Sequence, residues 1–508
     1  QLIDASDGFH IWSQTYDREL TDIFAIQDEI SAAIVKALVE RLNLTVAAVP
    51  KVQAAANTEA YDQYLLGIHQ MERRGVGPLA ASIEHFEKSL TLDPDYAPAM
   101  ARLSMSYSLI TSYSSDYPLS EALAKSDPLV ARAMELAPGL AEVHAAMGLN
   151  RWNHNNWMKA EAEFERAIAI NPSYATVYNW LAQLQGTLGR YGEQLENNEK
   201  AVRADPLSVL SLGNLVEVYA EHGRLAEARA LAERLKGLSP WHYHSARADI
   251  ADVEGRWADQ ALALLGALAE DPKNSGSRAV FIDVLALGFG LPEEALKISG
   301  QIVVPLIMLD RRDEAVDLLE HVYKNVSLFA RTDYAWALQE AGRDEESLAM
   351  YELDYAEWMQ GTGGQGFYDH WQLQSFATAR RRAGDEAGAM ALLKRSMVES
   401  AKQRDAGINI PYLDLDRGAA LYLMGQTNLG LRLIAKGASR GGKLVLFSVH
   451  LEPIYADPGF APIRADFEAR QIAERDKFLA AICNDGNPAP EVWTPAPETC
   501  EGYLEAAE

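Results

Sequence analysis

Four prolines recur in the middle of this chain at one fixed spacing. Pro138, Pro172, Pro206 and Pro240 are each separated from the next by 34 residues. Proline cannot continue a hydrogen-bonded helix, so each of these residues is expected to end the second helix of one structural unit. A period of this length is typical of a solenoid in which similar helix pairs stack in a row. The spacing therefore predicts a linear array of helix pairs.

The residues between the prolines repeat as well. Small or apolar residues stand ten positions after three of the prolines, at Gly148, Ala182 and Val216, which suits helices that cross closely. A glycine closes the first helix of several units, within residues 188–191, 222–225, 254–257 and 341–344. In period and pattern the chain resembles tetratricopeptide repeat (TPR) proteins. The resemblance implies an all-α, right-handed superhelical solenoid over residues 58–440, with about nine or ten helix pairs.

Net charge and hydropathy indicate which kinds of partner this chain is expected to lack. The 508 residues carry a formal net charge of −26, whereas nucleic acids and anionic membrane surfaces attract basic faces. We therefore expect no nucleic acid partner for this part of the chain. No apolar run approaches the length of about 18 residues that a bilayer-spanning helix needs, so no membrane span is expected here. The first residue is Gln1, and no signal peptide follows it, which suggests a fragment or a processed form.

The first 45 residues have a different pattern. Two short strands are expected within residues 1–16, followed by an amphipathic helix over residues 22–43. The stretches 1–5, 16–18 and 22–30, with Gly8 and Trp12, resemble the end of a TolB-like α/β domain. In bacterial proteins of this type the domain precedes TPR arrays, and a winged-helix or class III cyclase domain commonly lies further upstream. Residues 46–57, which include Pro50, are interpreted as a linker.

The repeat pattern becomes irregular toward the C-terminus. A helix is expected over residues 291–301, and the short Pro240–Pro272 interval suggests a clipped first helix in that unit. Residues 441–482 are interpreted as a segment that caps the apolar end of the stack, and residues 483–508 as a Pro-rich tail. Cys483 and Cys500 are the two cysteines of the chain. A disulfide between them is favoured over two unrelated thiols and would point to a periplasmic location; otherwise the location is expected to be cytoplasmic.

The concave groove of a TPR stack is lined by exposed residues of each first helix. The resemblance places nine residues there: Leu149, Trp152, Asn153, Thr176, Asn179, Gln183, Asn214, Glu217 and Glu221. Trp152 lies beside amides and is read as either groove or core. Aromatic and amide side chains suit a protein or peptide, or a small polar ligand. The absence of lysine among these positions disfavours the terminal-carboxylate clamp of chaperone-binding TPR domains.

Other motifs are read as structural. His242 and His244 have no third ligand in the pattern, so no metal site is predicted. The glycine-rich stretch 361–366 follows a helix rather than a strand, so it is interpreted as a loop and no cofactor is expected. An aromatic cluster between residues 351 and 371 is read as irregular core rather than a ligand pocket. No constellation of residues indicates catalysis.

Together these patterns predict a non-catalytic TPR module that senses a ligand or recruits a protein and regulates an output domain upstream, as in bacterial transcription regulators. Two alternatives remain open at this point. One is a constitutive periplasmic assembly scaffold. The other is the accessory region of a class III adenylate cyclase. The oligomeric state is unknown.

Overall fold

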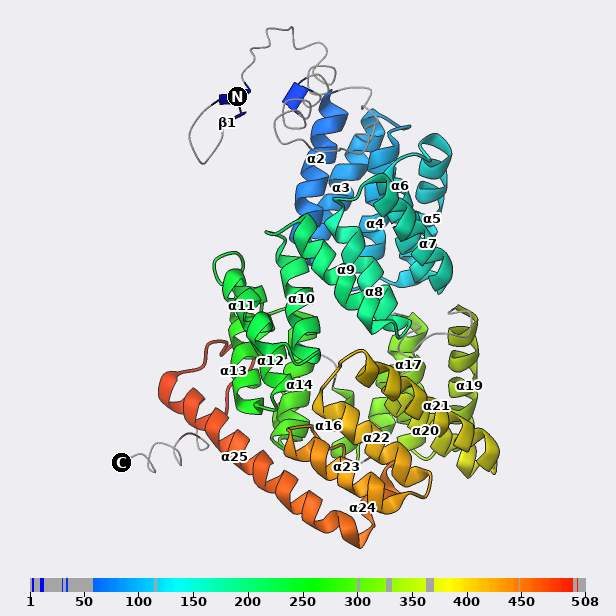
Figure 1. Ribbon diagram of the computed structural model, residues 1–508, viewed down its shortest axis with the longest axis vertical. Helices are drawn as coiled ribbons and strands as arrows, with labels where there is room; N and C mark the ends of the chain where they lie inside the picture. Colours follow the sequence, from blue (N-terminus) through cyan, green and yellow to red (C-terminus); the bar gives the residue numbers. More distant parts are fainter. Residues whose placement is uncertain are drawn as a thin grey trace.

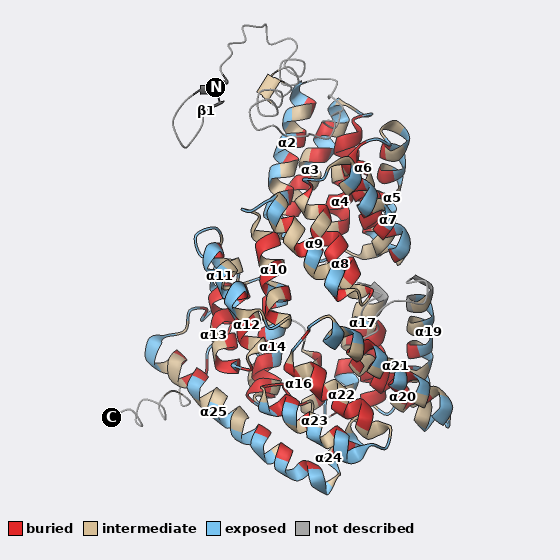
Figure 2. Cartoon of the chain, viewed as in Figure 1, coloured by how far each residue is buried: buried red, intermediate tan, exposed pale blue. Residues whose placement is uncertain are grey.

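Helix pairs stacked in a row dominate the structure. The computed structural model describes residues 58–113, 117–298, 302–325, 331–361, 370–446, 448–496 and 500, together with 2–3, 10–12, 30 and 33–34. From α2 to α24 the pairs follow one another around a curved path, as Figure 1 shows. Buried residues concentrate where neighbouring helices face each other (Figure 2). The predicted all-α TPR solenoid is confirmed.

The first half of the solenoid is regular. Each pair consists of two helices that contact each other more than any other element, from α2 with α3 to α12 with α13. Their bounds are α2 Thr58–Arg73, α3 Val76–Leu92, α4 Ala97–Ile110, α5 Leu119–Leu136, α6 Ala141–Asn153, α7 Trp157–Ile170, α8 Ala175–Thr187, α9 Tyr191–Ala204, α10 Val209–Glu221, α11 Leu225–Leu235, α12 Pro240–Val253 and α13 Trp257–Glu270.

Three of the four recurring prolines lie where the period predicts. Pro138, Pro172 and Pro206 follow the ends of α5, α7 and α9. Pro240 is different, because it is the first residue of α12, and the Ser239 side chain caps that helix by accepting from the backbone N–H of His242. Proline is well tolerated at a first helical position, where its missing N–H has no intrahelical partner. The prediction that Pro240 ends a helix is therefore wrong.

The shortened interval after Pro240 has the same cause. The helix α12 has 14 residues against 13 in α10, so the first helix of this unit is complete. The interval is short because α12 starts on Pro240 itself, whereas α10 starts three residues after Pro206; the connections before the two helices, 236–239 and 205–208, are equally long. The expected clipping of this helix is thus corrected.

The second half begins with an irregular stretch. Instead of one helix over residues 291–301, two short helices, α15 (Pro292–Ala295) and α16 (Val303–Met308), follow α14 (Ser275–Asp283) and the π-helical turn η2 (Val284–Gly288). Pro292 is the first residue of α15, and Pro305 lies in the first turn of α16, where a missing N–H costs no intrahelical hydrogen bond. Longer helices then resume: α17 Arg312–Asn325, α18 Arg331–Glu340, α19 Asp344–Gly361, α20 His370–Arg382, α21 Glu386–Asp405, α22 Pro411–Leu423 and α23 Thr427–Ser439.

The last helix closes this half of the solenoid. After α24 (Glu452–Tyr455) and the short turn η4 (Pro458–Phe460), α25 (Ala461–Asp485) contacts both α23 and α13. Its Phe467 ring meets Trp257 with 5.7 Å between centroids, and its Lys477 pairs with Asp259 of α13 at 3.0 Å. The helix therefore joins a late repeat to an earlier one, beyond the expected role of covering the end of the stack (Figure 1).

A second set of contacts closes the same ring on its other side. The backbone N–H of Asn409, between α21 and α22, donates to the Glu221 carbonyl at 2.8 Å. Gln403 of α21 donates to the Tyr191 hydroxyl of α9 at 3.1 Å. Helices α10 to α23 consequently enclose a central space, instead of leaving the open groove that a linear stack implies.

The N-terminal prediction falls mostly outside the described residues. Within residues 1–16 the structure describes β1 (Leu2–Ile3) and β2 (His10–Trp12), which pair antiparallel. Ile30, Ala33 and Ile34 are helical within the helix expected over residues 22–43. The linker 46–57 lies outside the described residues.

Candidate functional site

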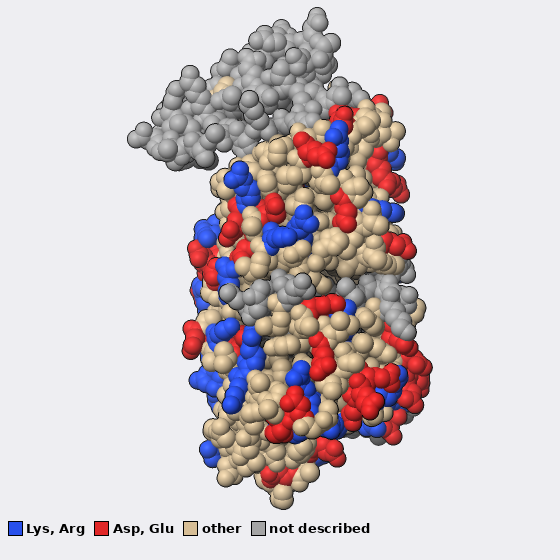
Figure 3. All heavy atoms as spheres, turned by 90° about the vertical axis from the view of Figure 1, so that its right-hand side faces the viewer, with Lys and Arg blue, Asp and Glu red and all other residues tan. Residues whose placement is uncertain are grey.

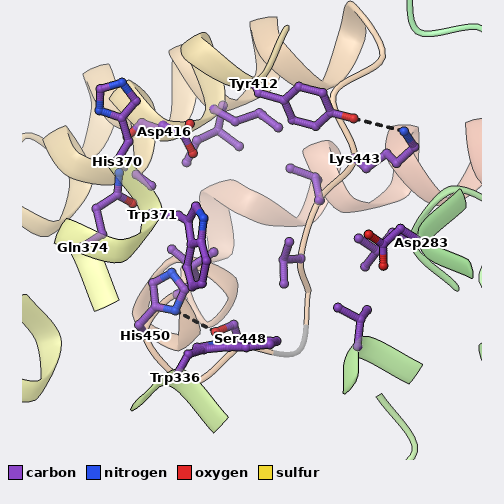
Figure 4. A pocket seen from close by; sticks show the side chains of 18 of the residues that line it. Asp283, Trp336, His370, Trp371, Gln374, Tyr412, Asp416, Lys443, Ser448 and His450 are labelled. Carbon is purple, nitrogen blue, oxygen red and sulfur yellow. Dashed lines mark hydrogen bonds between the residues drawn. The ribbon is translucent and has the colours of Figure 1, made fainter. Parts of the chain in front are cut away.

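A cavity of about 700 Å³ lies inside the ring formed by the second half of the solenoid. Side chains from α14, α16, α18, α20 and α22 form much of its wall. Another part of the wall comes from residues 441–446 and 448–451, between α23 and α24, here called the inner segment. A volume of this size falls in the range of small-molecule sites, which runs from about 300 to 1,000 Å³. Figure 4 shows labelled residues around it.

The inner segment enters the ring where two glycines meet. Gly255, in the turn before α13, has φ of +66°, and Gly441 has φ of +100°. A Cβ atom on Gly255 would lie 2.5 Å from both the Arg440 carbonyl oxygen and the Gly441 Cα. The indole N–H of Trp257 donates to the Gly441 carbonyl at 2.8 Å. Only a residue without a side chain permits this crossing of two backbones.

One anchor of the inner segment is a buried lysine. The Lys443 ammonium donates to Asp252 at 2.7 Å, to the Gln260 side-chain oxygen at 3.0 Å and to the Tyr412 hydroxyl at 3.1 Å. Burial by itself would lower the pKa of Lys443. The nearby Tyr412 and Asp252 have the larger combined effect, so the pKa is raised. These partners come from α12, α13 and α22, so this one side chain connects three helices.

The other anchor is a buried carboxylate at the end of α18. Glu340, which is 3% exposed, accepts from the backbone N–H of Val449 at 3.0 Å, and from the Ser448 hydroxyl. The indole N–H of Trp336 donates to the same carboxylate at 2.9 Å. Burial raises the pKa of Glu340, and these hydrogen bonds limit the shift. The carboxylate thus supplies acceptors for an irregular backbone that has no helix of its own.

Ser448 and His450 lie together in the cavity wall, as Figure 4 shows. The Ser448 Oγ lies 2.6 Å from His450 Nδ1 and also bonds Glu340. In this order the serine is the middle group, whereas nucleophilic catalysis needs a base between serine and acid. Burial, with a smaller effect of Arg382, lowers the pKa of His450 to about 3. The trio is suited to holding the inner segment rather than to proton transfer at neutral pH.

The rest of the cavity combines aromatic faces with carboxylates. Trp336 and Trp371 meet edge to face with 5.8 Å between ring centroids. Asp283 lines the cavity from the end of α14 (Figure 4). Burial raises the pKa of Asp283 to about 6, partly offset by Lys443. Trp371 belongs to the aromatic cluster interpreted as irregular core. That interpretation fits Tyr351, which is fully buried, but Trp371 lines the cavity.

The nine predicted groove residues do not share one environment. Leu149 and Asn179 are 7% and 3% exposed, so the expectation that they face a partner is corrected. Leu149 packs in the core of the first half, and Asn179 donates to the Ser211 hydroxyl at 2.8 Å. Trp152 packs against that same core with its ring edge to face with Phe164. Gln183 and Glu217 are exposed, and partial exposure is seen for Asn153, Thr176, Asn214 and Glu221.

Two of these residues line a second, smaller hollow. Gln183 and Glu221 border a space of about 190 Å³ with Tyr191 and Gln403, where α21 reaches the first half of the solenoid. Burial, reinforced by Glu217, raises the pKa of Glu221 to about 8. Burial also raises the pKa of Glu217. Glu221 therefore faces this hollow, whereas Glu217 is exposed.

Sequence reasoning missed the main cavity for an identifiable reason. Its anchors pair residues separated by 183 and 191 positions in the sequence, between Lys443 and the helices α13 and α12. One signal was present. The run 441–451 has no helical periodicity, yet it places the polar residues Lys443, Ser448 and His450 within a strongly apolar stretch. Buried polar groups need partners, which indicates that such a segment docks against something.

Several further features bear on the site. Cys483 and Cys500 form the favoured disulfide, with 5.3 Å between Cα atoms. Among the described residues, no cluster of three His, Cys, Asp or Glu side chains is placed to hold a metal ion. In the same part of the chain, every helix is too short or too polar to cross a bilayer. On the face shown in Figure 3, basic side chains are interspersed with acidic ones.

Comparison with known sequences identifies the repeats. Residues 145–209 and 196–240 match the tetratricopeptide repeat family. The chain is similar to "Putative adenylate cyclase 3" of Rhizobium meliloti (strain 1021), with 32% identity over 105 residues, which are 21% of this chain and 18% of that protein. It is also similar to "Superkiller protein 3" of Schizosaccharomyces pombe, with 27% identity over 189 residues, 36% of this chain and 13% of that protein. The chain thus spans less than a fifth of either relative.

Two solved structures match this chain at low identity and low TM-score. A human IFIT1 dimer with PPP-AAAA is 13% identical, with a TM-score of 0.38, and the match covers 76% of this chain and 95% of that one. The crystal structure of MamA protein is 19% identical, with a TM-score of 0.23, and the match covers 35% of this chain and 91% of that one. Together with the helix pairs described above, the matched repeats identify the fold of this chain as an all-α tetratricopeptide-repeat solenoid.

Proposed function

We propose that this chain is a non-catalytic interaction and ligand-sensing module that regulates an output domain upstream of it, as in bacterial transcription regulators. The observation that carries the proposal is the two-sided wall of the 700 Å³ cavity. Repeat helices form one side and the inner segment forms the other. A ligand between them contacts both, so its binding and the docking of the inner segment are thermodynamically coupled.

The anchors of the inner segment explain how such coupling would reach the rest of the molecule. Lys443 connects α12, α13 and α22, and Glu340 adds the end of α18. In a solenoid each unit contacts mainly its neighbours, and small rotations between units add up to a change of curvature. A cross-link through the centre restrains those rotations. Tightening or loosening it would change the curvature presented to a protein or peptide partner.

The domain layout belongs to the same proposal. Residues 1–45 would complete a TolB-like domain, joined by the linker 46–57 to the solenoid 58–440. Residues 441–482 would then serve as a lock inside and across the ring, rather than as a cap alone, and residues 483–508 as a disulfide-bonded tail. Among the predicted groove residues, Gln183 and Glu217 are the exposed candidates for partner contact.

Hydrogen exchange tests the coupling directly. Val304 of α16 lines the cavity and is partly buried, and Val304→Trp would fill part of the space. We expect altered exchange at the inner segment and in α12, α18 and α22, measured by mass spectrometry. Leu353→Trp, at a position on α19 that is 41% exposed, is the matched control and should change none of them. Unchanged exchange in both variants would argue against a sensing role for the cavity.

Two other functions have specific observations in their favour. The match to a putative adenylate cyclase favours an accessory region of a class III cyclase. The disulfide favours an oxidising compartment and with it a periplasmic scaffold. The coding sequence upstream of Gln1 separates the three: a winged helix supports the regulator, a cyclase domain supports the enzyme accessory, and a signal peptide alone supports the scaffold.

A further inference from the structure

The charges around the central cavity are strongly unbalanced. Its described lining includes Asp252, Asp283, Asp333 and Asp416, against a single lysine, Lys443. His450 also lines the cavity, but it is neutral near pH 7 because burial lowers its pKa to about 3. A concave site with low-dielectric walls and excess carboxylates attracts cations more strongly than the same charges on an open surface.

The single lysine is already occupied by other groups. Its three hydrogen bonds go to Asp252, Gln260 and Tyr412, at one end of the cavity (Figure 4). Asp283, by contrast, makes no hydrogen bond or ion pair with any described residue, and its exposed carboxylate lines the cavity. A carboxylate in this position has lost part of its hydration without gaining a protein partner. That arrangement is costly unless a ligand supplies the missing charge.

Apolar and aromatic groups complete the lining. Trp336 and Trp371 present indole surface, and Leu287, Val304 and Leu319 present aliphatic surface. Indole rings offer a large apolar surface against which a hydrocarbon chain can pack. A simple metal ion would leave this apolar surface unused. The lining therefore suits a molecule with both a hydrocarbon body and a positive charge.

The acidic character extends beyond the cavity along equivalent repeat positions. Glu217 on α10, Asp249 on α12 and Asp283 on α14 follow one another at spacings of about one repeat. Burial is the main cause that raises the pKa of Asp249, and the neighbouring carboxylates Glu217, Asp252 and Glu221 raise it further. These carboxylates lie close enough to raise one another's pKa, so a cation beside them would favour their charged forms.

We propose that the cavity binds an organic amine, with an ammonium group at Asp283 and a hydrocarbon chain against Trp336 and Trp371. This inference rests on the proposed ligand-sensing role of the cavity. The protein itself provides the precedent, because the primary ammonium of Lys443 is held in the same cavity by a carboxylate, an amide oxygen and a phenol.

Matched eight-carbon probes test the class of ligand. Octane diamine, octylamine, octanol and octanoate share one chain and differ in charge, and each is titrated calorimetrically into the 508-residue chain at neutral pH. We expect the two amines to bind at least about 10-fold more tightly than octanol, which corresponds to about 1.4 kcal/mol, and octanoate to bind least. The diamine can also engage a second carboxylate, so it should bind at least as tightly as the monoamine.

Variants locate the charge that matters. Asp283→Asn should weaken octylamine binding about 10-fold or more and leave octanol binding unchanged, since the amide cannot form the charge-assisted hydrogen bond that the carboxylate makes with an ammonium. Asp317→Asn, at an exposed position on α17, is the control and should leave both unchanged. Unchanged octanol binding also shows that the cavity of Asp283→Asn is intact.

The outcomes separate the two proposals. Octanol or octanoate binding as tightly as the amines would overturn the amine assignment and leave the cavity as a ligand site. Equal loss of amine affinity in Asp283→Asn and Asp317→Asn would also overturn it, because it would show a general surface charge effect. Absence of binding by all four probes would overturn both the amine assignment and the ligand-sensing proposal.

Discussion

Replacing Gly255 by alanine gives a direct test of how the inner segment is held. Gly255 and Gly342 both close helix turns of the repeat, with φ of +66° and +75°. Alanine in this left-handed region costs about 1 kcal/mol at either position. At Gly342 a Cβ atom would meet nothing within 4 Å, whereas at Gly255 it would lie 2.5 Å from backbone atoms of Arg440 and Gly441.

The structure supplies the expected difference between the two variants. Backbone atoms cannot rotate away as a side chain can, so relief of the overlap requires the two segments to separate, at about 1–3 kcal/mol. Separation also weakens two hydrogen bonds, from Trp257 to the Gly441 carbonyl and from Arg470 to the Gly255 carbonyl at 2.9 Å. Together these bonds are worth about 2 kcal/mol. We therefore expect Gly255→Ala to lose about 4–6 kcal/mol when both bonds are lost, and Gly342→Ala about 1 kcal/mol.

Two measurements decide the matter. Urea unfolding followed by tryptophan fluorescence reports the loss of stability, and hydrogen exchange reports where protection is lost. Exchange should rise at residues 441–451 in Gly255→Ala and stay unchanged there in Gly342→Ala. Equal destabilisation of both variants, with equal protection of residues 441–451, would refute the proposed backbone crossing.

Three other predictions concern contacts elsewhere in the structure. Lys443→Met removes the buried ammonium from Asp252 and should cost about 3 kcal/mol in urea unfolding, whereas a change below about 1 kcal/mol would mean that the pair is not desolvated. Gly148→Ala should lower the free energy of unfolding by about 1–3 kcal/mol, because its Cβ atom would lie 2.5 Å from the Phe164 ring. Gly139→Ala, where a Cβ atom would meet nothing within 4 Å, should lower it far less. Similar losses in the two variants would contradict close helix packing at Gly148. The unfolded chain protonates His450 near pH 6.5, but the folded chain does so only near pH 3, so stability should fall by up to about 1.4 kcal/mol per pH unit below pH 6.5. His450→Asn should make that loss smaller, and an identical pH profile for the variant would show that His450 is not buried as a neutral ring.

The regular repeats were predictable because their signals are local. Glycine at 189, 223 and 255 is the residue that a left-handed turn favours, and the prolines at 138, 172 and 206 end their units. Proline is ambiguous, however, since it fits the first position of a helix as well as the residue after one. The repeat pattern therefore gave the wrong role for Pro240, which begins α12 instead of ending a helix.

The central cavity was not predictable from local signals. Its wall depends on Lys443 finding Asp252 and on Val449 finding Glu340, pairs that are far apart in the sequence. The groove positions taken from the repeat pattern assumed an open trough, but in this chain α21 and α25 fold back onto earlier helices. Repeat periodicity describes how neighbours stack and carries no information on whether a late unit returns to an early one.

The contacts of α25 have a consequence for how the chain is made. Synthesis proceeds from the N-terminus, so α12, α13 and α18 leave the ribosome well before residues 441–485 exist. During that interval Asp252, Gln260 and Glu340 face water without their later partners. Final maturation of this half must therefore wait until residues 441–485 have been made, and a nonsense codon just after α23 would leave the helix pairs up to α23 without the segment that crosses the ring.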